Sequence, residues 1–160
     1  MEATRIIAIR HGETAWNVDT RLQGHLDIPL NDTGLWQARQ AALALADEPI
    51  DAIYSSDLQR AWVTASAIAE TTRAPLTAHQ GLRERSFGVL QGHTFAELEA
   101  KDPEQAHRWR KRDPDFAPQG GESLIALRER ITATTHEIAA QHLGGQIVLV
   151  AHGGVLDVLY

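Results

Sequence analysis

The chain has 160 residues, a formal net charge of −6 and no cysteine. Its hydrophobic fraction of 43% and charged fraction of 22% are ordinary for a soluble globular protein, and its length predicts a single domain over residues 1–160. This composition excludes disulfides and thiol catalysis, and the negative charge argues against partners that are nucleic acid or anionic membrane.

The sequence predicts no signal peptide and no membrane span. The apolar run at residues 6–9 is too short for the core of a signal peptide, and no apolar stretch approaches the ~20 residues that a membrane span requires. A chain without cysteine suits a reducing compartment, so we expect a cytoplasmic protein.

Strand and helix patterns alternate along the chain. In chain order we expect strand 4–10, helix 33–46, strand 50–55, helix 58–72, strand 75–79, short helices 94–100 and 103–112, helix 123–141, strand 146–151 and a helix that begins at residue 154. This alternation predicts an α/β fold, a three-layer sandwich with a mainly parallel central sheet.

Local patterns refine these elements. Thr33 and Asp57 are predicted to cap the helices that follow them. The helix at 33–46 has an apolar stripe, formed by Leu35, Ala38, Ala42 and Leu45. The runs at 4–10 and 146–151 are apolar enough to predict strands that are buried.

The first and last of these strands each end at a histidine followed by glycine: His11-Gly12 and His152-Gly153. In open α/β sheets, ligands bind beyond the carboxyl ends of the strands, so neighbouring strands would make His11 and His152 face each other. Glycine leaves the approach unobstructed and permits a sharp turn. One such histidine is more often structural, but two in matched positions indicate a site.

Two arginines accompany the histidines. Arg10 precedes His11, and Arg60 lies in the first turn of the helix that follows Asp57. Guanidinium groups match phosphate oxygens, and a helix start is electropositive, so the set predicts a phosphate cradle. Arg60 alone could be a surface charge. Metal binding is the alternative for the histidines, but the chain has no H-x-x-x-H spacing, and Arg10 would repel a cation.

These residues belong to a longer series of motifs. In chain order the series is RHGET (10–14), WN (16–17), LQG (22–24), PLNDTG (29–34), SSDLQRA (55–61), LRE (82–84), GVLQG (88–92), GGES (120–123) and HGG (152–154). The series resembles the histidine phosphatase superfamily, which includes the phosphoglycerate mutases. Its motifs stand in family order and span nearly the whole chain, whereas RHG alone would be a weak signal.

The resemblance implies a role for each matching residue. His11 would be the nucleophile that becomes phosphohistidine, and Glu84 the general acid and then base. The phosphoryl oxygens would be bound by Arg10, Arg60 and His152. Supporting contacts to the substrate are expected from Asn17, Gln23, Gly24 and Gly153. No cofactor and no metal ion is implied.

Elementary chemistry agrees with these roles. A histidine nucleophile needs one bare ring nitrogen, so the other should donate to a fixed acceptor such as a backbone carbonyl. Fixed cations can stabilise a phosphoryl transition state without magnesium. An acid at Glu84 must stay protonated, which burial favours. Glu13 is the competing acid, but we expect it to make a structural hydrogen bond.

Three functions use such a site. We favour a phosphatase acting on a small anionic phosphomonoester, because the stretch between Glu84 and Gly121 is compact. A phosphoglycerate mutase is the alternative, but the family's mutases have a longer insertion after the acid residue and an extended C-terminal tail. A silent phosphate-binding module is the third, although it would typically lack the nucleophile or the acid. Residues 94–116 are expected to form a lid that sets specificity.

Two surface features complete the predictions. The basic cluster at residues 108–112 is interpreted as a solvated helix face rather than a nucleic-acid patch. The sequence stops in a helix just begun, where family members usually continue, so the domain looks short at its C-terminus. We expect uncovered apolar surface near Val155, Leu156 and Leu159, which would favour partner contacts such as a homodimer.

Overall fold

The computed structural model describes residues 2–160, in which four strands form one parallel sheet. The strands are β1 (Arg5–Arg10), β2 (Ala52–Ser55), β3 (Leu76–Ala78) and β4 (Gln146–Ala151), in the spatial order β1-β4-β2-β3. The first and last strands are therefore neighbours, as predicted. Arg10 stands beside Ala151, so both strands end at the same level.

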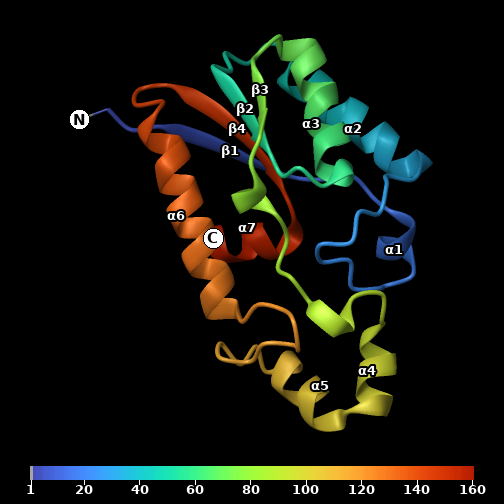
Figure 1. Ribbon diagram of the computed structural model, residues 1–160. Helices are drawn as coiled ribbons and strands as arrows, with labels where there is room; N and C mark the ends of the chain where they lie inside the picture. The colour runs from blue at the N-terminus through green and yellow to red at the C-terminus, as the bar shows by residue number, and fades with distance from the viewer. Residues whose placement is uncertain (1) are drawn as a thin grey trace.

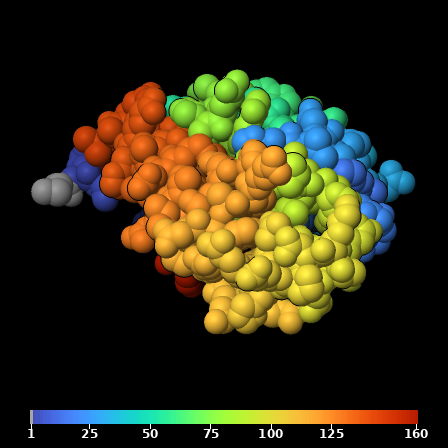
Figure 2. Space-filling view, turned by 60° about the horizontal axis from the view of Figure 1, so that its bottom comes forward, coloured from blue at the N-terminus to red at the C-terminus, as the bar shows by residue number. Residues whose placement is uncertain are grey.

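Helices cover both faces of this sheet, which confirms the predicted three-layer sandwich (Figure 1). The helices are α1 (Ala15–Val18), α2 (Asp32–Leu45), α3 (Gln59–Thr72), α4 (Phe95–Lys101), α5 (Pro103–Arg110), α6 (Leu124–Ala140) and α7 (Gly153–Leu159), with 3-10 turns η1 (Gln80–Leu82) and η2 (Gly88–Leu90). Helices α2 and α3 lie on one face, and α6 and α7 on the other. We call α4 and α5 the lobe, which lies at the bottom of Figure 1 and appears yellow in Figure 2.

The centre of the core is β4, whose side chains alternate between the two faces. Ile147 and Leu149 pack toward α6 and α7, whereas Val148 and Val150 pack toward α2 and α3. All four are at most 1% exposed. Burial of each such side chain contributes about 1.5–3 kcal/mol, so β4 is the anchor that holds His152 in place.

Three local predictions were wrong. β1 is an edge strand whose residues are half-buried or exposed, because only β4 pairs with it. The cap of α2 is Asn31, whose Oδ1 accepts from the Gly34 amide at 2.8 Å, rather than Thr33. Asp57 does not cap α3, because its carboxylate pairs with Arg83 at 2.6 Å.

The expected apolar stripe and C-terminal surface are only partly present. Ala38 and Ala42 of α2 are buried, but Leu35 is 38% exposed. In α7, Val155 is buried against the α6 side of the core, whereas Leu159 is 37% exposed. Within residues 2–160, no helix combines the length and apolar character needed to cross a membrane.

Candidate active site

His11 and His152 lie together at the carboxyl edge of the sheet, as the strand-end pattern predicts. The amide of His11 donates to the Ala151 carbonyl at 3.1 Å, which extends the pairing of β1 with β4 by one residue. The two imidazole rings meet edge to face, with centroids 5.1 Å apart and an interplanar angle of 61°. Both rings are buried, so the strands fix them as one unit.

The ring of His11 has a defined tautomer. Its Nδ1 lies 2.5 Å from the Gly12 carbonyl oxygen, which can only accept, so Nδ1 carries the proton and Nε2 is bare. Burial lowers the pKa of His11 to about 4, and the charges of Arg60 and Arg10 act in the same direction against the Gly12 hydrogen bond. The imidazole is therefore neutral at pH 7, with a lone pair at Nε2.

Glycine follows His11 because the backbone is crowded there. A Cβ on Gly12 would collide with the carbonyl oxygen of Gly34, at the start of α2. The Gly12 amide donates to the Thr64 hydroxyl at 3.1 Å. Helices α2 and α3 thus hold the turn that presents His11.

His152 is fixed from behind by a serine. Its Nε2 lies 2.8 Å from Ser56 Oγ, and the same hydroxyl lies 3.3 Å from the Leu58 amide, which donates to it. The hydroxyl can donate its proton to His152 Nε2 while it accepts from that amide, and in this arrangement the ring proton is on Nδ1. Nδ1 has no hydrogen-bond partner within residues 2–160. Burial, reinforced by Arg60, holds the pKa of His152 well below its usual range.

Arg60 is a buried cation, not the surface charge of the alternative interpretation. It is 1% exposed, and its guanidinium donates to the carbonyls of Leu26 at 2.7 Å and Gly24 at 2.8 Å. Among the described residues, its Nε has no partner. Burial lowers the pKa of Arg60 to about 10, against the opposing charges of Glu84 and Asp27, so it remains protonated at pH 7.

The two glycines after His152 lie against charged neighbours. The Arg10 guanidinium carbon lies 3.4 Å from the position that a Cβ on Gly153 would occupy, which is ordinary van der Waals contact. A Cβ on Gly154 would collide with the carboxylate of Glu84. The missing side chain at Gly154 therefore lets Glu84 approach the histidine pair, whereas Gly153 packs against Arg10 without a need for glycine.

Glu84 combines burial with two backbone hydrogen bonds. Its carboxylate accepts from the Arg85 amide at 2.7 Å and from the Gly154 amide at 3.1 Å. Burial raises its pKa, although these amides and the charges of Arg60 and Arg10 work against the shift. A carboxyl group with a raised pKa is suited to donate a proton near neutral pH.

The sequence did not predict the side chains that hold the backbone of Glu84 in place, His25, Arg130 and Glu122, which we call the clamp. The Glu84 carbonyl oxygen accepts from His25 Nε2 at 2.7 Å and from Arg130 at 3.1 Å. Arg130 also pairs with Glu122 at 2.8 Å, and Glu122 accepts from the Ser86 amide at 2.8 Å. One signal was available: Arg130 lies at helical spacing from buried Leu127, which places it on the inner side of α6.

The predicted residues converge on a cavity of about 160 Å³, which we call the phosphate cavity. Its lining includes the predicted residues Arg10, His11, Asn17, Gln23, Gly24, Arg60 and Glu84. His152 and Gly153 lie just behind it, against His11 and Arg10 respectively. Gln23 and Asn17 are both held by Thr14, whose hydroxyl donates to Gln23 Oε1 at 2.7 Å.

Glu13 makes a structural hydrogen bond, as expected of the competing acid. Its carboxylate accepts from the Asn31 side chain at 2.9 Å, and Asn31 caps α2. In residues 2–160, no three histidine, aspartate or glutamate side chains are grouped as metal ligands would be.

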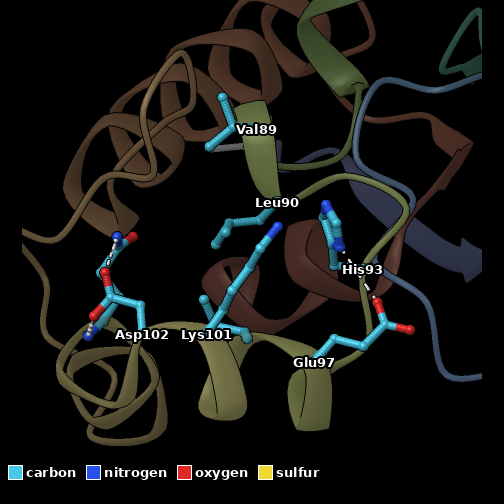
Figure 3. A pocket seen from close by; sticks show the side chains of 8 residues that line it. Val89, Leu90, His93, Glu97, Lys101 and Asp102 are labelled. Carbon is cyan, nitrogen blue, oxygen red and sulfur yellow. Dashed lines mark hydrogen bonds and ion pairs between the residues drawn. The ribbon is translucent and has the colours of Figure 1, made fainter.

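A roomier cavity of about 300 Å³ lies in the lobe, between η2 and α4–α5 (Figure 3). Three of its polar side chains are engaged with one another or with a helix end: His93 pairs with Glu97 at 3.2 Å, and Asp102 caps α5. Lys101 extends up into this cavity beside Leu90 and His93. None of its lining residues lines the phosphate cavity, so size does not mark the chemical site.

Comparison with known proteins agrees with the geometry. Residues 6–160 match the model of the histidine phosphatase superfamily (branch 1). The chain is 42% identical to phosphoglycerate mutase-like protein 4 of Arabidopsis thaliana, over 100% of the chain and 71% of that protein. It is 41% identical to the metal-independent phosphoserine phosphatase of the same plant, over 99% of the chain and 68% of that protein.

A solved structure shares both the fold and the sequence pattern. The mycobacterial glucosyl-3-phosphoglycerate phosphatase, in a complex with VO3, superposes with a TM-score of 0.90 at 38% identity. The match covers 97% of this chain and 78% of that one.

Proposed function

This chain belongs to the histidine phosphatase superfamily (branch 1), and we propose that it hydrolyses small phosphomonoesters through a phosphohistidine formed on His11, without a metal. Several relatives are named as phosphatases, and one of them as metal-independent.

One observation carries the assignment to this site. Two buried donors, Nδ1 of His152 and Nε of Arg60, have no partner within residues 2–160, and both belong to the group around His11. A buried donor without an acceptor costs about 1–3 kcal/mol, so such donors persist where a ligand supplies the acceptor. The oxygens of a phosphoryl group would accept from both, next to the bare Nε2 of His11.

The first step transfers the phosphoryl group to the enzyme. Nε2 of His11 attacks phosphorus while the bond to the ester oxygen breaks, and Glu84 gives that oxygen its proton so that a neutral alcohol leaves. Arg10, Arg60 and His152 stabilise the charge on the phosphoryl oxygens.

The second step returns the enzyme to its starting state. Glu84, now a carboxylate, takes a proton from a water molecule whose oxygen attacks phosphorus, and the P–N bond to His11 breaks. Inorganic phosphate is released, and both side chains regain their initial protonation. Asn17, Gln23 and Gly24 border the phosphoryl group in this scheme, and Gly153 packs against Arg10.

The alternatives have weaker support. Phosphoglycerate mutase activity is favoured by the names of some relatives, such as the mutase-like protein of Arabidopsis thaliana. A silent binding module would need neither a bare Nε2 nor an acid with a raised pKa, and this chain has both.

The setting of the enzyme is also part of the proposal. A cysteine-free chain suits the cytoplasm, and the continuous sheet favours a single domain over residues 1–160. The exposed Leu159 at the end of α7 would support a homodimer, which sedimentation of the purified protein can test. With a charge of −6, we propose no nucleic-acid partner.

The test is phosphate release from a panel of phosphomonoesters in excess EDTA, with wild type and His11→Gln. We expect chelator to leave the rate unchanged and the substitution to lower kcat by at least ~10⁴-fold, as loss of a nucleophile does elsewhere. Turnover retained in His11→Gln would reject His11 as the nucleophile. Loss of activity in the chelator would show that the reaction depends on a metal ion. Isomerisation of 3-phosphoglycerate faster than its hydrolysis would favour the mutase.

A further inference from the structure

One motif of the sequence has no role in the proposed reaction: GGES, at residues 120–123. Its Glu122 forms a bidentate ion pair with Arg130 of α6, in which Nε and Nη2 of the arginine lie 2.9 Å and 2.8 Å from the two carboxylate oxygens. A pair with two parallel bonds fixes direction as well as distance. The helix that carries Arg130 is anchored in the core by Leu127 and Ile131, which are fully buried. The pair is therefore a fixed point on α6.

Arg130 directs its other donors at the segment that leads into the proposed acid. Its Nη1 donates to the carbonyls of Gly81 at 2.9 Å and Arg83 at 2.8 Å, and its Nη2 donates to the carbonyl of Glu84 at 3.1 Å. A guanidinium has five N–H donors in one plane, so a single arginine can hold three carbonyls and a carboxylate together. Lysine has a point charge on a flexible stem, so it could not reproduce this geometry.

Glu122 holds the chain on the other side of the acid. Its Oε1 accepts from the Ser86 amide at 2.8 Å, and its own amide donates to the Ser86 carbonyl at 2.8 Å. The two backbones are so close here that a Cβ on Gly121 would lie 2.6 Å from the same carbonyl oxygen. The backbone before and after Glu84 is therefore bound to one ion pair.

The backbone of Glu84 in turn decides where its carboxyl group points. That group accepts from the Arg85 amide at 2.7 Å and from the Gly154 amide at 3.1 Å. The first amide belongs to the segment that the ion pair holds, and the second belongs to α7, which follows His152. The carboxyl group therefore keeps both partners only while the segment keeps its place relative to α7. A misplacement of about 1 Å can cost a reaction about 10²-fold in rate.

We propose that Glu122 and Arg130 are a positioning pair for general-acid catalysis: they fix the backbone on both sides of Glu84 so that its carboxyl group reaches the leaving oxygen. Neither residue lines the phosphate cavity, so the pair acts through Glu84 and not on the substrate. Its two opposite charges cancel, so it adds no net charge beside the acid. This inference rests on the proposed function, since it takes Glu84 as the acid.

The test compares two substrates that differ in their need for an acid. One is the alkyl phosphate on which wild type is fastest in the panel above, such as 3-phosphoglycerate, whose leaving oxygen needs a proton. The other is p-nitrophenyl phosphate, which releases a stable anion. We expect Arg130→Met to lower kcat for the alkyl phosphate by about 10- to 100-fold, the effect of a misplaced catalytic group, and kcat for p-nitrophenyl phosphate by less than about threefold.

Two milder variants extend the series. Arg130→Lys keeps the charge without the fork of donors, so its loss on the alkyl phosphate should be intermediate. Glu122→Gln should also slow the alkyl phosphate more than p-nitrophenyl phosphate, because an amide no longer forms the ion pair. Arg128→Met is the matched control, because Arg128 lies on the same helix, is exposed and takes no part in these contacts. It should change neither rate.

Equal losses on the two substrates in Arg130→Met would indicate a general structural role and overturn this inference, as would no loss on either. If that variant does not fold, Arg130→Lys and Glu122→Gln decide the matter: a wild-type ratio of the two rates in both would overturn the inference.

The same assay separates this inference from the proposed function. Glu84→Gln should show the largest gap between the two substrates. That gap without any in the Arg130 and Glu122 variants would overturn this inference alone, whereas no hydrolysis of p-nitrophenyl phosphate by wild type would reject the proposed function.

Discussion

The carboxyl edge of the sheet and the lobe are built in opposite ways. At the sheet edge, His11, Arg60 and His152 are buried, and each is held by a hydrogen bond to a backbone carbonyl or to a serine. Each also keeps one nitrogen without a hydrogen-bond partner among residues 2–160. In the lobe, polar side chains serve the helices themselves: Thr94 and Glu97 form a capping box on α4. The comparison suggests that chemistry requires fixed groups with spare hydrogen-bonding capacity, whereas the lobe can vary without moving them.

Packing separates the two regions further. The sheet edge rests on β4, whose side chains belong to both large clusters of the core. The lobe packs on η2 through a small separate cluster, formed by Leu90, Leu98 and Ala106. A region with few buried apolar groups opens locally at a lower free energy, so we expect lobe amides to exchange hydrogen faster than those of β4.

The largest effect is expected at the sheet edge, from removing the acid. Glu84→Gln keeps the shape of the side chain but cannot donate the proton, so kcat for alkyl phosphates should fall by about 10²–10⁴-fold. The fall should be much smaller for p-nitrophenyl phosphate, whose leaving group is stable as an anion. Steady-state kinetics on both substrates checks this, and an equal loss on both would argue that Glu84 is not the acid.

The pH profile sharpens the same assignment. Burial lowers the pKa of His11 to about 4, so its bare form should be lost as pH falls through about 4. The pKa of Glu84 is raised, so its protonated form survives above the usual carboxyl range and is lost as pH rises through that raised value. We expect a bell-shaped kcat/KM, and Glu84→Gln should abolish its alkaline limb. An alkaline limb retained in that variant would assign it to another group.

A smaller effect is expected from the residue behind His152. Ser56→Ala removes the partner of Nε2 and frees the ring to change tautomer, so kcat should fall about tenfold, the cost of one hydrogen bond. Ser55→Ala is the matched control, because that buried hydroxyl donates to the Ser56 carbonyl and not to His152. Equal activity in the two variants would show that the serine does not orient the ring.

The smallest effect is expected in the lobe. Lys101 is exposed and extends into the 300 Å³ cavity (Figure 3), and it does not line the phosphate cavity. Lys101→Ala should therefore change kcat/KM for p-nitrophenyl phosphate by no more than about twofold, as surface substitutions usually do. A loss as large as that in Ser56→Ala would contradict the separation of the two regions.

The residues of the site could be predicted from the sequence better than the contacts that hold them in place. Strand ends at His11 and His152 were predictable because an apolar run that stops at His-Gly has a local pattern, and the pairing of β1 with β4 then brings the rings together. Asp57 was mistaken for a cap because its partner, Arg83, comes 26 residues later. The edge position of β1 was unpredictable for a similar reason, since strand order depends on partners and not on the strand itself.

The clamp around Glu84 shows the same limit. His25 and Arg130 reach the Glu84 carbonyl across 59 and 46 residues of sequence, and nothing local links them. Only the spacing of Arg130 from Leu127 hinted that this arginine points inward. Side-chain bonds to backbone atoms of distant segments follow from the tertiary fold, so they become visible once that fold is known.

The most direct test is to trap the intermediate. Wild type is mixed with p-nitrophenyl phosphate, quenched in base during turnover, digested and analysed by mass spectrometry. We expect a phosphoryl group on the peptide that contains His11, stable in base and lost in acid as a P–N bond is, and absent from His11→Gln. A phosphoryl group on a serine or aspartate, or one that persists in His11→Gln, would contradict the account.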